Sequence, residues 1–185
     1  CSFRSTLIPG LVLMWVFKLG GSLLHNPLLK QWLTIIAEHG RGKAVIVPGG
    51  GKFADAVRTA QNELRFHDAS AHRMALLAMA QVGYMLCDVQ PRLTAATSIA
   101  AVYTALEHQQ TPVWLPLDLL ETRRSVEESR RMSSDSLSAW LAREIDAHAA
   151  ADFLQFVREL PQLREVPFPQ RARLGQQFSR FLQPL

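Results

Sequence analysis

Cysteine, charged residues and long apolar runs are all scarce in this chain. The two cysteines, Cys1 and Cys87, have no metal-binding spacing and imply no disulfide framework. We therefore expect a reduced compartment, the cytoplasm. The apolar run at residues 7–17 is interrupted by Pro9 and Gly10 and is too short to span a membrane. No membrane partner is expected.

Charge is low and spread along the chain. Charged residues make up 19% of the sequence, and the formal net charge of +4 comes mostly from scattered arginines. There is no dense basic block with interleaved aromatic residues, so we expect no nucleic-acid partner. With 48% hydrophobic residues in a length of 185, the chain has enough apolar material for a well-buried domain, which argues against wholesale disorder.

Strand and helix patterns alternate along the chain. We predict strands at 15–19, 44–47 and 112–117, and helices at 27–39, 53–64, 69–86, 98–108 and 136–145. The alternation predicts an α/β fold, a three-layer αβα sandwich with a mainly parallel sheet. The predicted domain covers residues 12–147. The remainder, 148–185, is a proline-punctuated tail without a strand pattern, so we describe the C-terminal part as atypical or truncated.

A lysine, two glycines and a hydroxyl follow the first predicted strand, in the order Lys18, Gly20, Gly21 and Ser22. Glycine lets the backbone approach a ligand closely, and a helix that starts directly afterwards would present free N–H groups to an anion. The lysine adds a mobile positive charge suited to a phosphate. This pattern predicts a phosphate-binding turn, although a tight strand-to-helix turn without a ligand has the same sequence.

A second glycine turn strengthens that prediction. Gly49, Gly50 and Gly51 follow the second strand, and glycines in a row are costly unless something approaches the backbone. Turns at the carboxyl ends of parallel strands face one crevice, which is where open α/β sheets bind ligands.

The third element is the polar start of the helix at 136–145, where Ser134 and Asp135 stand. One interpretation is a simple helix cap, in which the side chain accepts from backbone N–H groups. The other is that Asp135 organises a lysine around a transferred phosphoryl group, because phosphoryl transfer depends on positioning and charge stabilisation.

Taken together and in this order, the three elements resemble the amino-acid kinase family, with the resemblance covering residues 15–145. The resemblance implies a kinase that transfers the γ-phosphoryl group of ATP, with Mg²⁺, to a small-molecule acceptor. In this family, acceptors carry phosphate, carboxylate, carbamate or hydroxyl groups.

The resemblance also assigns roles by position. Lys18 would bridge the transferring phosphoryl group, and Asp135 would orient that lysine. The nucleotide phosphates would be bound by Gly20, Gly21, Ser22 and Ser134, and the acceptor or the phosphoryl group in transit by Gly49, Gly50 and Gly51.

Acceptor recognition has three further candidates: Asp55, Arg58 and His72. The arginine fork suits a phosphate or carboxylate. Each has an alternative: Asp55 and Arg58 stand three apart on a helix and could simply pair with each other, and His72 could be a structural histidine. Lys52 could be a ligand or a solvated loop charge.

Residues 51–58 and 71–79 are most similar to one branch of the family, tied to methanofuran-type cofactor synthesis, which contains an aminomethylfuran-methyl-phosphate kinase. The implied acceptor is a furan-methyl phosphate. The family's later nucleotide-binding region is not recognisable, and no lysine follows Lys52. A second hypothesis is therefore a non-catalytic regulatory or binding subunit with the kinase fold. The long apolar helix at 69–86 indicates a homodimer under either hypothesis.

Overall fold

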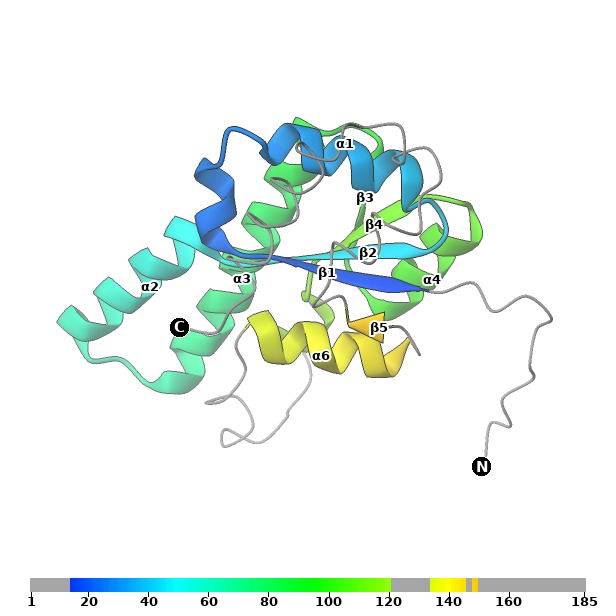
Figure 1. The fold of residues 1–185 in the computed structure, drawn as a ribbon. Coiled ribbons are helices and arrows are strands. Elements are labelled where there is room, and N and C mark those ends of the chain that lie inside the picture. The colour runs from blue at the N-terminus through cyan, green and yellow to red at the C-terminus, as the bar shows by residue number, and fades with distance from the viewer. Residues whose placement is uncertain (1–13, 121–133, 146–147, 150–185) are drawn as a thin grey trace, which may run out of the picture.

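The computed structural model describes residues 14–120, 134–145 and 148–149 (Figure 1). The predicted tail therefore lies almost entirely outside the described residues. In chain order the elements are β1 (Trp15–Leu19), the short 3-10 helix η1 (Gly21–His25), α1 (Leu29–His39), β2 (Ala44–Pro48), α2 (Gly51–Leu64), α3 (Asp68–Val89), β3 (Leu93–Ala96), α4 (Ile99–Glu107), β4 (Thr111–Trp114), η2 (Asp118–Leu120), α6 (Ser134–Glu144) and β5 (His148–Ala149).

The strands form one sheet in the order β3-β4-β2-β1-β5, and every described pair is parallel. Parallel neighbours require crossover connections, and the helices between the strands supply them. In the β1–β2 register, Lys18 lies opposite Val47 and Leu19 opposite Pro48, so both strands end at the same level. The turns that follow these strands therefore leave the sheet side by side.

Helices cover both faces of the sheet, which confirms the predicted three-layer α/β fold. Figure 1 shows α1 on one side of the sheet and α4 and α6 on the other. Alternate residues of β1 divide between two cores: Phe17 packs with α1 and the later part of α3, and Val16 packs with α4 and α6. Trp32 fills the first core and Trp114 the second, both fully buried.

The structure differs from the predicted elements in several places, and the strand predicted at 112–117 ends at Trp114. β3 and β5 were not predicted: β3 reads Leu-Thr-Ala-Ala, with little β-branched content, and β5 has only two residues. The helix after the first glycine turn is the five-residue η1, and α1 begins only at Leu29. Asn26 separates the two, because its side chain accepts from the backbone N–H of Leu28 at 2.9 Å.

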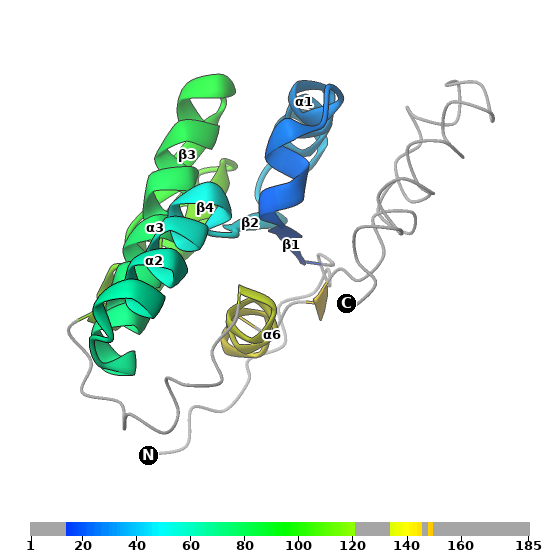
Figure 2. The same ribbon diagram turned by 90° about the vertical axis from the view of Figure 1, so that its left-hand side faces the viewer.

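Helix α3, 22 residues long, is apolar over much of its surface but is not buried all round. One side packs on the sheet, and α2 lies along its N-terminal half (Figures 1 and 2). A third strip of α3 stays exposed. None of the described helices combines the length and the apolar composition that a membrane crossing requires.

At Gly83, α3 packs tightly against residues at the ends of β2 and β4. A Cβ there would lie 2.1 Å from Leu115 Cδ2, 3.3 Å from Pro48 Cγ and 3.4 Å from Val113 Cγ1. A side chain here would have to displace the end of Leu115 and would press on Pro48 and Val113, so glycine suits the close packing of α3 on the sheet.

We expect Gly83→Val to lower the free energy of unfolding by about 1–3 kcal/mol through overpacking. The matched control is Gln81→Val, which places the same side chain on an exposed position of the same helix. Thermal or urea unfolding measures both. Equal stability of the two variants would contradict the close packing of α3 on the sheet.

Candidate active site

The glycine turns after β1 and β2 are in direct contact. The backbone N–H of Gly49 donates to the carbonyl oxygen of Leu19 at 2.7 Å. A Cβ on Gly21 would lie 2.5 Å from the Cα of Gly51, a distance that real side chains do not tolerate. The two turns can therefore meet only because Gly21 lacks a side chain, whereas a Cβ on Gly51 would press on the Leu24 side chain, 2.8 Å away.

Packing between the turns, and not only a ligand, accounts for the second set of glycines. Gly51 has a φ of +51°, in the left-handed region that favours glycine. A Cβ on Gly50 would lie 2.5 Å from the Cβ of Ala54. The sequence attributes these glycines to a ligand, whereas the structure shows that the backbone also needs them to start α2 beside the first turn.

Lys18 and Asp135 form an ion pair, with the ammonium nitrogen 3.0 Å from the carboxylate oxygen. Lys18 is the penultimate residue of β1, and its side chain points to the same face of the sheet as Val16, which is the face that α6 covers. Asp135 stands in the first turn of α6. The exposed fractions are 22% for the lysine and 71% for the aspartate, so the pair lies at the mouth of the site and contributes about 1 kcal/mol at most.

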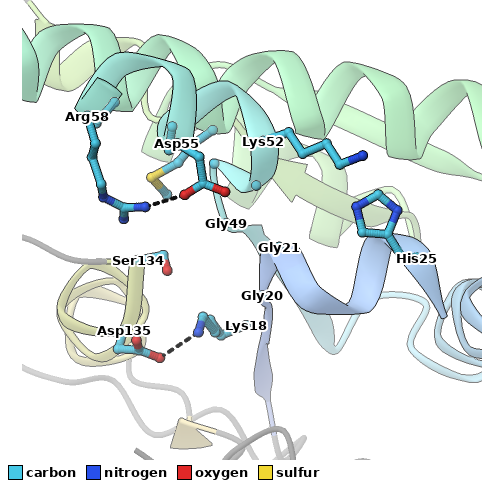
Figure 3. A pocket seen from close by; sticks show the side chains of 15 residues that line it. Lys18, Gly20, Gly21, His25, Gly49, Lys52, Asp55, Arg58, Ser134 and Asp135 are labelled. Carbon is cyan, nitrogen blue, oxygen red and sulfur yellow. Dashed lines mark hydrogen bonds and ion pairs between the residues drawn. The ribbon is translucent and has the colours of Figure 1, made fainter. Parts of the chain in front are cut away.

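A cavity of about 640 Å³ opens between these elements (Figure 3). It brings together nearly all of the residues predicted from the sequence: Lys18, Gly20, Gly21, Gly49, Gly50, Gly51, Asp55, Arg58, Ser134 and Asp135. Lys52 lines it too, together with His25, which the sequence analysis missed. The only signal for His25 is its position at the end of the short helix that follows the first glycine turn.

Asp55 and Arg58 pair with each other and also line the cavity. The guanidinium nitrogen lies 2.5 Å from the carboxylate oxygen, and the side chains are 68% and 72% exposed. An exposed pair of this kind is weak, worth about 1 kcal/mol or less. The arginine can therefore exchange its carboxylate for an anionic ligand at small cost.

Among the predicted residues, His72 is not brought into this arrangement, and the structure does not test Ser22. His72 is not among the described residues that line the cavity, although it stands one helical turn before Ala75, which does. Burial lowers the pKa of His72, so its imidazole is neutral at pH 7. Ser22 lies in η1, but the position of its side chain is outside what the structure describes. The roles of both stay predictions.

A lysine beside two touching glycine turns, at the carboxyl ends of adjacent parallel strands, is an arrangement of the α/β class that suits a bound anion. The chain belongs to the amino acid kinase family, whose model matches residues 14–151.

Two relatives illustrate the similarity. The [5-(aminomethyl)furan-3-yl]methyl phosphate kinase of Methanocaldococcus jannaschii is 30% identical over 135 residues, which cover 72% of this chain and 62% of that protein. The crystal structure of uridylate kinase from Archaeoglobus fulgidus matches with a TM-score of 0.56 at 19% identity, covering 73% of this chain and 60% of that one. The chain thus spans about three fifths of the length of these relatives, 62% and 60%. The second likeness concerns the fold alone.

Proposed function

We propose that the protein is an ATP-dependent kinase that transfers the γ-phosphoryl group to a small-molecule acceptor in the cytoplasm. The observation that supports this most directly is the Lys18–Asp135 pair at 3.0 Å, in one cavity with both glycine turns. Phosphoryl transfer needs positioned positive charge and N–H donors more than covalent chemistry. These groups supply both.

The proposed roles follow from the placement of each group. Lys18 stabilises the negative charge that develops on the transferring phosphoryl group, and Asp135 holds the lysine ammonium at the cavity mouth. Helix α2 begins at Gly51 without a side-chain cap from Gly50, so its first backbone N–H groups are left for a bound anion. Substrate phosphates would compete with the Asp135 and Asp55 carboxylates for Lys18 and Arg58.

ATP and Mg²⁺ are the implied cofactors, and the phosphate half of the site fits them. The glycine turns and Lys18 suit a nucleotide phosphate tail. Among residues 14–120, 134–145 and 148–149, no group of three or more His, Cys, Asp or Glu side chains could hold a metal ion. Mg²⁺ commonly binds through substrate phosphates and water, where it neutralises phosphate charge.

For the acceptor we propose a furan-methyl phosphate or a similar small phosphomonoester. The relative from Methanocaldococcus jannaschii bears the name of a furan-methyl phosphate kinase. The cavity lining is also suited to added negative charge, because its three cations, Lys18, Lys52 and Arg58, outnumber its two carboxylates, Asp55 and Asp135. Arg58 is the residue that we expect to hold the phosphate already present on the acceptor.

We expect Lys18→Ala to lower the rate of ADP formation from ATP and a furan-methyl phosphate by about 100-fold or more, as loss of a transition-state donor does. Asp135→Asn should lower the same rate because the lysine ammonium loses the carboxylate that orients it. Both variants should keep nearly the full unfolding temperature, because the ion pair is weak and partly exposed. A coupled ADP assay and thermal unfolding measure the two effects. Lys30→Gln, on the exposed face of α1, is the control for loss of a lysine.

Full turnover in Lys18→Ala would contradict the role proposed for the lysine. Anion binding by a folded wild-type protein without any phosphoryl transfer would instead favour the second hypothesis, a non-catalytic binding subunit.

We also propose that the protein forms a homodimer through the exposed strip of α3. Met74, Leu77, Tyr84 and Met85 are 39%, 45%, 52% and 37% exposed and fall on one side of the helix. Two copies that pack this strip against itself would bury it in both subunits, as a two-fold interface requires.

Leu77→Asp is expected to convert the dimer to a monomer, because a carboxylate would be buried in the interface. Light scattering at micromolar concentration measures the mass. Leu64→Asp, 75% exposed at the far end of α2, is the matched control and should leave the dimer intact. A wild-type monomer at that concentration would overturn the proposed dimer.

A further inference from the structure

We propose that His25 and Lys52 form a second phosphate seat in this cavity, separate from the Lys18–Asp135 centre. The seat would hold a phosphate group that is not transferred, either on the nucleotide or on the acceptor. This deepens the proposed function and rests on it for the identity of the ligand. The sequence alone assigns no role to His25, and it leaves Lys52 open between a ligand and a solvated loop charge.

The two side chains are brought to one end of the cavity by the contact between the glycine turns. His25 is the last residue of η1, and Lys52 is the second residue of α2. Their elements start at Gly21 and Gly51, the two glycines that touch. Figure 3 shows the Lys52 side chain directed toward the His25 ring, on the opposite side of the glycine turns from Lys18 and Asp135.

Within the part of the chain that the structure describes, no carboxylate pairs with the charge at this end of the cavity. The two carboxylates that line the cavity are already paired, Asp135 with Lys18 and Asp55 with Arg58. Among the described residues, Lys52 and His25 have no ion-pair or hydrogen-bond partner, and both are exposed. An ammonium group and an imidazole that line the same cavity, with no carboxylate partner among the described residues, are suited to attract an anion.

The start of α2 supplies further backbone N–H donors next to Lys52, and the seat shares them with the anion bound at the Lys18–Asp135 centre. Gly50 gives no side-chain cap, so the backbone N–H groups of Gly51, Lys52 and Phe53 have no partner within the helix. The dipole of this 14-residue helix adds to the positive potential there. A phosphate has enough acceptor oxygens to bind the ammonium, the imidazole N–H and a backbone N–H together. The seat therefore matches a phosphate better than a single carboxylate.

Calorimetric titration of the whole chain tests the seat with three probes: inorganic pyrophosphate, MgADP and furfuryl phosphate. The variants are Lys52→Gln and His25→Asn, which replace exposed side chains, and circular dichroism confirms that they fold. We expect Lys52→Gln to weaken pyrophosphate binding about tenfold, as loss of a charge-assisted hydrogen bond does, and His25→Asn to weaken it less. Lys30→Gln, which removes the same charge outside the cavity, should leave the affinity unchanged.

The two remaining probes identify the source of the phosphate. A matching loss for MgADP assigns the seat to the nucleotide, and a loss for furfuryl phosphate assigns it to the acceptor. Unchanged binding of all three probes in Lys52→Gln would overturn the seat, and the kinase proposal would stand if the wild type still transferred phosphate. Lys52-dependent binding of pyrophosphate without transfer would overturn the kinase proposal alone. A folded wild type that binds none of the probes would overturn both.

Discussion

The contact between Gly21 and Gly51 is the constraint on which the rest of the site depends. A Cβ on the first would lie 2.5 Å from the Cα of the second, so the two turns meet backbone to backbone. This contact sets where α2 begins relative to the end of β1. It thereby places Lys18, the free N–H groups of α2 and the side chains of Lys52 and His25 around one cavity.

The electrostatics of the cavity follow from that geometry. Lys18 and Arg58 each form a weak ion pair with an exposed carboxylate. The third cation, Lys52, has no carboxylate partner among the described residues. Weak pairs orient a side chain without fixing it, since their free energy is small compared with that of a phosphate contact. The arrangement suits a site that exchanges one anionic ligand for another in each turnover.

The sequence predicts the strands and turns near the site better than the outer strands of the sheet. An apolar run at β1 and a β-branched run at β2, each followed at once by glycine, predict the strands and the turns that build the cavity. β3 and β5 escape prediction because their sequences, Leu-Thr-Ala-Ala and His-Ala, have weak strand propensity and are held by pairing with β4 and β1. These two strands therefore form through pairing with their neighbours and not through local sequence propensity.

The same distinction holds for the site residues. Lys18 and Asp135 are predictable because their motifs are local, although only the fold shows that they lie 3.0 Å apart. His25 is not predictable, since its relevance arises from a contact between turns that stand thirty residues apart in the chain. Sequence alone also does not show why position 21 has to be glycine. The structure shows that the backbone of Gly51 leaves no room for a side chain there, whether or not a ligand binds.

The most direct measurement compares MgADP binding by Gly21→Ala with that by Gly40→Ala. Gly40 also lacks room for a side chain, because a Cβ there would lie 2.5 Å from that of Ala44. It stands before β2, at the amino ends of the strands, whereas the cavity lies at their carboxyl ends. Both variants should lose stability, by about 1–3 kcal/mol. At a temperature where both are folded, only Gly21→Ala should lose MgADP binding, because its turns are forced apart. Wild-type affinity in a folded Gly21→Ala protein would contradict the account.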